Sequence, residues 1–231
     1  MKKMLFGLGV VGLGLLAVGD ARASFVEVIY DNGGPNQLGG SEMTRFIQAE
    51  DFVLSAATKF TDVRFWSLEL PVGYQGSFVW QIYGDNAGQP GSLLNSGEAV
   101  PLRRSTGKTF GAYQEYENTF SAGIISLGAG TYWLGLHNGP LTTATLQNVR
   151  WETTGQIHNP TGFEDATPFG VGPWEATGLE HAFQLGVPEP SQIATGVLLL
   201  GGVAGYVVRR RRAKSNHAAP PLPPPHRNTA L

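Results

Sequence analysis

Acidic residues that stand in pairs are the side chains in this sequence best suited to catalysis. A polysaccharide hydrolase or lyase can use two carboxyl groups that face each other across a cleft. Because neighbouring residues of a strand point to opposite faces, the members of an adjacent pair are not expected to serve each other in this way. Glu50 shares a face with Phe52 and Leu54, and we expect it to be either a buried polar residue or a site member. The candidates are Glu50 with Asp51, Glu164 with Asp165, and Glu180 beside His181.

The motifs of the common enzyme classes are absent. Ser105–Thr109 ends like a phosphate-binding loop, but Leu102 stands where the first glycine is required. No serine-nucleophile elbow, metalloprotease helix motif or dinucleotide fingerprint occurs. We therefore predict a protein that is not an enzyme and has no cofactor, with a carbohydrate-active enzyme as the alternative. The histidines His137, His158 and His181 do not have zinc-site spacing, and we expect hydrogen-bonded structural roles for them.

Two short acidic and amide segments offer hard oxygen ligands for calcium. They are Asp31 with Asn32 and Asp85 with Asn86, each in a segment rich in turn residues. Their spacing does not distinguish a cation site from an ordinary turn. A calcium-stabilised adhesive module is therefore one hypothesis, and plain turns are the other reading.

Charge is distributed unevenly along the chain. The 231 residues carry a formal net charge of −2. Residues 24–186 contain about seven basic and sixteen acidic side chains, a net charge of about −9. Such a surface repels phosphates, so we predict no nucleic acid partner and favour cations or neutral sugars. The sequence has no cysteine, which excludes disulfides and thiolate sites.

The N-terminus has the organisation of a secretory signal peptide. Lys2 and Lys3 precede an apolar run over residues 4–18, and the small residues Ala21 and Ala23 stand where signal peptidase reads its substrate. We expect cleavage before Ser24, so that residues 1–23 are removed on export.

The C-terminal part has the organisation of a membrane segment with a fixed orientation. An apolar stretch over residues 193–208 predicts a transmembrane helix spanning 191–208. Sixteen apolar residues of helix rise about 24 Å, slightly less than the hydrocarbon layer. The cluster that follows favours the cytoplasmic side, which leaves the preceding domain in the periplasm. It consists of Arg209, Arg210, Arg211 and Arg212.

Residues 187–212 resemble the PEP-CTERM sorting signal of Gram-negative bacteria. The resemblance rests on Pro188-Glu189-Pro190, the apolar segment and the arginine cluster, in that order. It implies recognition by an exosortase, an integral membrane protease that cuts at or near the motif. It also implies transient anchoring in the inner membrane, followed by release or attachment at the cell surface, commonly in organisms that make exopolysaccharide. One departure is the continuation over 213–231, which we expect to be a proline-rich, disordered cytoplasmic tail.

Residues 24–186 have the pattern of an all-β domain. Short β-type runs are separated by Gly, Pro, Asn and Asp, and no helical periodicity exceeds two turns. We predict an antiparallel β-sandwich of jelly-roll-like type. Within it, 131–136 should form a central strand, 85–91 a loop, and His181 should point to the core. The expected strands are 25–30, 49–54, 59–68, 77–83, 113–120, 131–137, 146–152 and 179–185.

The segments 46–52, 85–91 and 132–137 resemble uncharacterised β-sandwich ectodomains of surface-anchored bacterial proteins. That resemblance implies a fold and a location, but no activity. Most of the five tryptophans should lie in the core, with Trp174 the best candidate for an exposed sugar-stacking ring. We predict an exported, non-enzymatic surface or matrix protein whose sandwich binds extracellular polysaccharide or serves structurally.

Overall fold

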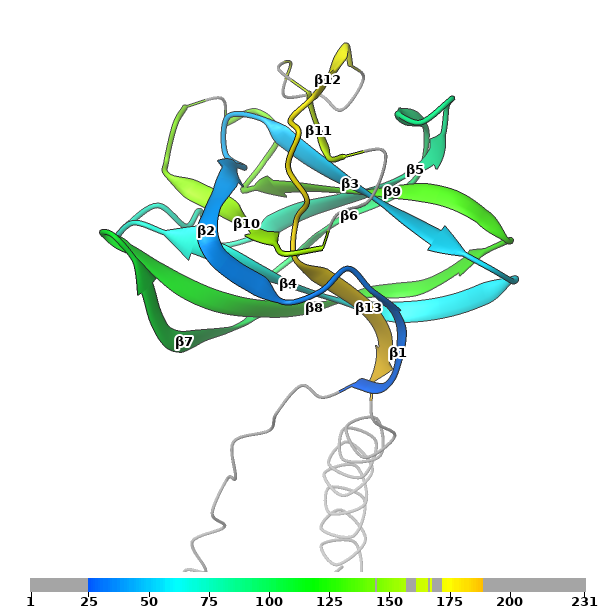
Figure 1. Ribbon diagram of the computed structural model, residues 1–231, viewed down its shortest axis with the longest axis horizontal. Helices are drawn as coiled ribbons and strands as arrows, with labels where there is room; N and C mark the ends of the chain where they lie inside the picture. The colour runs from blue at the N-terminus through cyan, green and yellow to red at the C-terminus, as the bar shows by residue number, and fades with distance from the viewer. Residues whose placement is uncertain (1–24, 144, 157–160, 166, 168–171, 189–231) are drawn as a thin grey trace, which may run out of the picture.

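The computed structural model describes residues 25–188, except for 144, 157–160, 166 and 168–171. The described chain is all β: thirteen strands form two antiparallel sheets that lie face to face (Figure 1). This confirms the predicted fold class and agrees with a β-sandwich. None of the described residues belongs to a helix that could cross a membrane. The expected signal peptide, the helix over 191–208 and the tail lie outside the described residues.

The first sheet has seven strands and is organised around β4 (Thr58–Glu69). One edge of β4 pairs with β8 over its full length, and the other pairs with β13 and then with β10. The order is β1-β13-β4-β10-β2, and β7 pairs with β8 on the far side. The remaining strands are β1 (Phe25–Asp31), β2 (Pro35–Glu42), β7 (Leu102–Phe110), β8 (Tyr113–Leu127), β10 (Val149–Thr154) and β13 (Phe183–Pro188).

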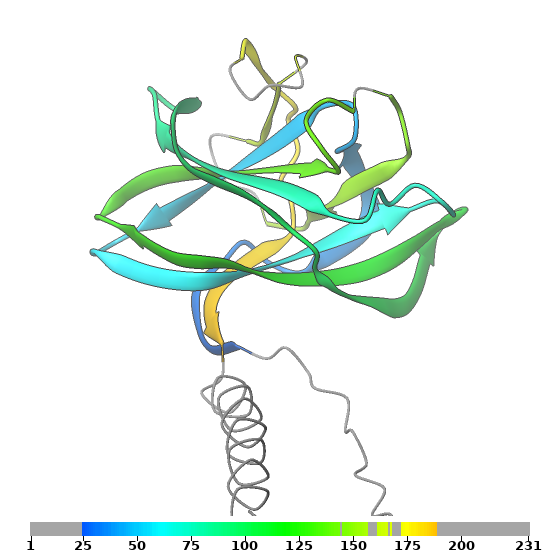
Figure 2. The ribbon, with the colours of Figure 1, turned by 180° about the vertical axis from the view of Figure 1, so that it is seen from behind.

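The second sheet has six strands in the order β12-β11-β3-β9-β5-β6. As expected for a strand that is apolar on both faces, β9 is central and pairs with β3 and β5. Strand β6 is an edge strand and crosses the front of the molecule in the rear view (Figure 2). The strands are β3 (Ile47–Leu54), β5 (Phe78–Asp85), β6 (Pro90–Ala99), β9 (Gly130–Asn138), β11 (Phe163–Asp165) and β12 (Trp174–Ala176).

A single aromatic core fills the space between the sheets. Trp151 of β10 is fully buried, and its ring makes edge contacts with Phe65 and Phe183 at centroid distances of 6.3 and 5.8 Å. Its indole N–H donates to the carbonyl of Ala182 at 2.9 Å, so the polar atom of this large side chain is satisfied. Burial of each such ring stabilises the fold by roughly 1.5–3 kcal/mol. Trp151 therefore packs β10 against β13. The candidate site lies beside this contact.

A smaller apolar cluster lies on the outer face of the six-stranded sheet. Ala49, Tyr83 and Trp133 are buried there, and Phe163 and Trp174 pack against them. These two covering residues come from β11 and β12, a short hairpin that pairs with β3. The hairpin explains why β3 and β9 are buried on both faces.

The two ends of the domain lie together. Strand β1 pairs with β13, and Phe25 is opposite Pro188 in the register. Phe25, which follows the expected first residue of the exported protein in the sequence, and Pro188, the first residue of the expected sorting motif, are therefore neighbours at one edge of the seven-stranded sheet.

Candidate functional site

A buried network of four polar side chains connects the two sheets. Glu50 comes from β3, Ser41 from β2, and Glu180 and His181 from the segment before β13. The Glu50 Oε2 atom lies 2.7 Å from His181 Nδ1 and accepts the His181 main-chain N–H at 2.8 Å. The other ring nitrogen, Nε2, lies 2.9 Å from Ser41 Oγ. His181 and Glu50 have no exposed surface, which confirms the prediction that His181 points to the core.

Burial determines the protonation of this network. It lowers the pKa of His181 to about 3, so the ring is neutral at physiological pH. Burial, together with the nearby charge of Glu180, raises the pKa of Glu50 well above its ordinary value. A neutral ring has one donor and one acceptor nitrogen. Since Glu50 Oε2 already accepts the main-chain N–H, we assign the ring proton to Nδ1, which donates to Glu50, while the Ser41 hydroxyl donates to Nε2.

The order serine, histidine, carboxylate is that of a nucleophilic triad, but burial argues for a structural role. Such a triad requires a substrate carbonyl beside the serine oxygen. Here Ser41 is only 8% exposed, and the ring of His181 stacks on Trp151 at a centroid distance of 5.0 Å inside the core. The network therefore ties β2, β3 and the β13 segment together across the sandwich.

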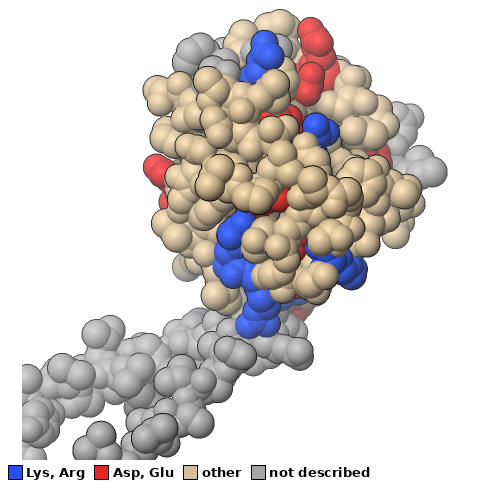
Figure 3. Space-filling view, turned by 90° about the vertical axis from the view of Figure 1, so that its left-hand side faces the viewer, with Lys and Arg blue, Asp and Glu red and all other residues tan. Residues whose placement is uncertain are grey.

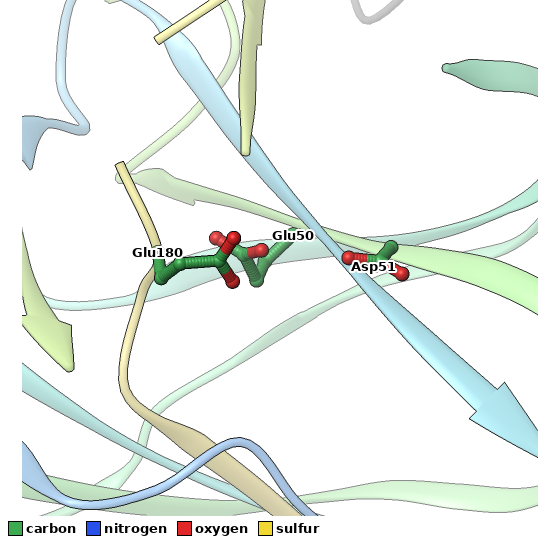
Figure 4. Close-up of side chains that lie close together, drawn as sticks. All are labelled: Glu50, Asp51 and Glu180. Atoms are coloured by element: carbon green, nitrogen blue, oxygen red, sulfur yellow. The ribbon is translucent and has the colours of Figure 1, made fainter. Parts of the chain in front are cut away.

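Asp51 adds a third carboxylate to the cluster. One oxygen each of Glu50, Asp51 and Glu180 lies within 4.8 Å of the others, and all three residues are buried. Glu50 and Asp51 leave β3 on opposite sides, as alternation predicts (Figure 4). One carboxylate oxygen of each nevertheless lies within 4.8 Å of the other. Such oxygens can hold a cation or share a proton.

A groove lies beside this cluster, with Glu180 in its wall. We call it the β2–β10 groove, and its volume is about 610 Å³. Leu38, Phe110 and Leu179 are exposed apolar side chains on it, at 77%, 40% and 40%. It combines these apolar groups with hydroxyl, amide and guanidinium groups. The lining residues are Asn36, Leu38, Gly39, Gly40, Phe110, Arg150, Thr153, Thr154, Gln156, Thr161, Gly178, Leu179 and Glu180.

Several groove side chains are held in place by the protein. Thr153 donates its hydroxyl to Asn36 Oδ1 at 2.8 Å, and Asn36 Nδ2 donates to the Thr154 carbonyl at 2.7 Å. Arg150 donates to the Tyr113 hydroxyl and to the Gly40 carbonyl, both at 3.2 Å. The groove is thus a preorganised surface rather than a gap between flexible side chains.

The residues proposed as calcium ligands are engaged in hydrogen bonds within the protein. Asp31 Oδ1 accepts the Gly33 N–H at 2.8 Å, and Asn32 is fully buried and donates to the His181 carbonyl at 2.9 Å. Asp85 accepts the Gly88 N–H and the Trp133 indole N–H. Asn86 stands in the turn between β5 and β6, where its main-chain N–H donates to the Gln89 carbonyl. The bonds to Gly33, Gly88 and Gln89 are those of turns, whereas the bonds of Asn32 to His181 and of Asp85 to Trp133 join distant segments. The acidic cluster of the described residues forms elsewhere.

The other sequence candidates are also placed by the structure. Asp165 is buried and accepts the main-chain N–H groups of Thr167 and Gly172. Glu164, half-buried on the same short strand, accepts from Gln48 at 3.2 Å. His137 is buried and bonds to the Gly139 carbonyl. His158, like the sorting motif, the arginine cluster and the signal-cleavage residues, lies outside the described residues, apart from Pro188 at the end of β13.

A second buried acid pair, Glu115 and Glu152, was not apparent from the sequence. Glu152 Oε1 accepts the Gln37 main-chain N–H at 3.0 Å, and Gln37 Nε2 donates to Glu115 Oε2 at 2.6 Å. Burial and the charge of Glu115 raise the pKa of Glu152 to about 8. The two acids are far apart in the sequence and meet only because β8 and β10 flank β4. No local pattern signals such a meeting.

Basic side chains gather in the lower part of the face shown in Figure 3. Several of the basic residues form ion pairs with acids of the same sheet: Arg64 with Glu117, Arg103 with Glu69, and Lys108 with Glu115. Positive charge that is paired within the protein is less available to an anionic partner.

The chain matches no protein-family model, and comparisons with curated proteins and with solved structures likewise give no match.

Proposed function

We propose that this chain is an exported cell-surface or extracellular-matrix protein whose β-sandwich binds polysaccharide without chemically changing it. After signal peptidase removes residues 1–23, the Arg209–Arg212 cluster keeps the C-terminal end in the cytoplasm while the sandwich lies in the periplasm. An exosortase then cuts at or near Pro188-Glu189-Pro190 and transfers the domain to the surface or the matrix. Phe25 and Pro188 are opposite each other in the sheet, so both cuts fall at one edge of the sandwich.

The β2–β10 groove is the observation that carries the binding proposal. A sugar ring presents an apolar face and a rim of hydroxyl groups. Phe110 and Leu38 offer exposed apolar surface, while Gln156 and Thr161 offer amide and hydroxyl groups within the same 610 Å³. A binding module needs no more than this surface, held in place by β2 and β10.

Removal of the Phe110 ring tests the groove. We expect Phe110→Ala to weaken binding of a neutral glycan about tenfold, because the largest apolar side chain of the groove and its only aromatic ring are lost. The measurement is affinity electrophoresis of the full chain in mild detergent, through native gels that contain hydroxyethyl cellulose, laminarin or galactomannan. Ile124→Ala is the matched control, since Ile124 is 75% exposed on β8 and does not line the groove. Equal mobility of Phe110→Ala and the unsubstituted protein in every gel would remove the groove from the proposal.

A carbohydrate-active enzyme is the second candidate, and one observation favours it. Glu180 lines the groove, and Glu50 lies close behind it with a raised pKa, as in an acid that donates a proton. Against this, Glu50 is fully enclosed and bonded to His181. Release of reducing ends from a neutral glycan that is lost in Glu180→Gln would establish the enzyme, whereas the binding module releases none.

A further inference from the structure

A second cleft lies on the opposite sheet, away from the β2–β10 groove. Its volume is about 670 Å³, and it is formed by the turn between β5 and β6 together with the approach to β12. We call it the Trp174 cleft. It is lined by Asp85, Asn86, Gln89, Pro90, Gly91, Ser92, Gly172, Pro173 and Trp174.

Buried side chains beneath this cleft hold its aromatic ring and its carboxylate in place. The ring of Trp174 packs edge-on against Tyr83 at a centroid distance of 5.3 Å and an angle of 80°. Tyr83 is fully buried, and its hydroxyl donates to Gln81. Asp85 Oδ1 accepts the indole N–H of the buried Trp133 at 3.1 Å. A ligand would therefore meet a surface already in position, which reduces the entropy lost on binding.

The polar groups of the turn are available to a ligand. The side chains of Asn86, Gln89 and Ser92 make no hydrogen bond within the described part of the chain. The turn is held by the main-chain bond from Asn86 N–H to the Gln89 carbonyl and by the Asp85 carboxylate, which accepts the Gly88 N–H. Together they present two planar amides and a hydroxyl beside the half-buried ring of Trp174. Amides and carboxylates can bond two adjacent hydroxyl groups at once, and an aromatic ring covers the apolar face of a pyranose.

The charge of the lining selects among glycans. It contains no lysine or arginine, and its one ionisable side chain is the carboxylate of Asp85. An acidic sugar would meet a like charge, which weakens its binding. The cleft also lacks the deep apolar pocket that anchors a peptide side chain.

We propose that the Trp174 cleft is a second glycan subsite, which takes neutral pyranose units stacked on Trp174 and hydrogen-bonded to Asn86, Gln89 and Asp85. The choice of a glycan rests on the proposed function, but the cleft is built from the six-stranded sheet, whereas the β2–β10 groove is built from the seven-stranded one. One molecule thereby contacts two segments of polysaccharide, and the second contact increases the overall affinity through its effective concentration.

The test uses affinity electrophoresis of the full chain in mild detergent, with hydroxyethyl cellulose, laminarin, galactomannan or alginate in the gel. We expect retardation by at least one neutral polymer and none by the anionic alginate. Trp174→Ala should weaken that retardation about tenfold. Because Trp174 also packs on Tyr83, the double variant Asn86→Ala/Gln89→Ala tests the same cleft with the ring intact, and a loss of about fivefold is expected.

The outcomes separate this subsite from the groove. If both cleft variants migrate like the unsubstituted protein while Phe110→Ala loses retardation, the subsite is wrong and the proposed function stands. If the cleft variants lose retardation and Phe110→Ala does not, the subsite stands and the groove is wrong. Retardation of the unsubstituted protein by none of the neutral polymers, or by alginate alone, overturns both.

Discussion

Replacing His181 by alanine lowers the free energy of unfolding by about 3 kcal/mol. The substitution removes the ring donor from the enclosed carboxyl of Glu50 and the ring acceptor from the hydroxyl of Ser41. It also leaves a void against Trp151, on which the ring stacks. A buried polar group that loses its partner has no water to replace it, so the losses of hydrogen bonding and of packing act together. Urea unfolding of residues 24–188 followed by tryptophan fluorescence gives the change.

Ser41→Ala is the matched control for this loss. It removes one hydrogen bond of the same network and leaves the ring of His181 in place, so its cost should be about 1 kcal/mol. If His181→Ala cost no more than Ser41→Ala, the ring would not be the member that ties the two sheets together, and the structural account of the network would be wrong.

Replacing Glu152 by glutamine flattens the dependence of stability on pH between pH 6.5 and 8.5. The pKa of Glu152 is raised to about 8 in the folded state, so the folded protein holds a proton that the unfolded chain has already lost. The stability from that proton is present at low pH and is lost as the pH rises through about 8. For one such group the loss between pH 6.5 and 8.5 is about 2 kcal/mol.

The pH window is chosen to exclude His181. The pKa of that ring is lowered to about 3, so its contribution is lost mainly as the pH falls from about 6.5 towards 3, and His181 is common to both proteins. The pKa of Glu50 is raised, like that of Glu152, but Glu50 is common to both proteins and cancels in the comparison. Urea unfolding at pH 6.5 and 8.5 should show the unsubstituted protein losing about 2 kcal/mol more than Glu152→Gln. If both proteins lost the same stability between pH 6.5 and 8.5, Glu152 would not hold the proton responsible.

The sequence pattern predicted the strands that contribute side chains to the apolar core. It missed strands whose side chains are mostly exposed. All eight expected strands overlap observed ones, and the turn after β5 lies within the expected loop. The missed strands include β6 and β7, whose residues are mostly exposed and rich in Gly, Ser and charged side chains. Such strands form because a neighbour offers a backbone edge, as β8 does for β7, and that is a tertiary cause with no periodic signal.

The prediction of the last strand, over 179–185, was correct only for its C-terminal part. Phe183 and Leu185 are buried as alternation requires, but the strand begins at Phe183 rather than Leu179, and Leu179 is 40% exposed. Glu180, which alternation placed on the opposite face to His181, is also buried. The segment before β13 is held by Glu50 and by single bridging contacts instead of by a ladder, so a period of two does not apply to it.

The sequence identified most residues of the candidate site but not how they are arranged. Glu50, Asp51, Glu180 and His181 were identified from residue type, but nothing in the sequence placed Ser41 beside them, since it is 140 residues from His181. Likewise, Trp174 was expected to be exposed and is half-buried, because Tyr83 supports its ring from below. Contacts between distant strands decide these features, and they depend on the order of strands in the sheets.

Sorting of the protein is tested by intact-mass and terminal-peptide mass spectrometry of the protein recovered from the organism that makes it, with membrane and extracellular fractions kept separate. We predict a mature chain that begins at Ser24, ends near Pro188–Pro190 and is found outside the cell or on its surface. A membrane-bound chain that keeps residues 191–231 would contradict sorting by an exosortase and would make the C-terminal segment a permanent anchor.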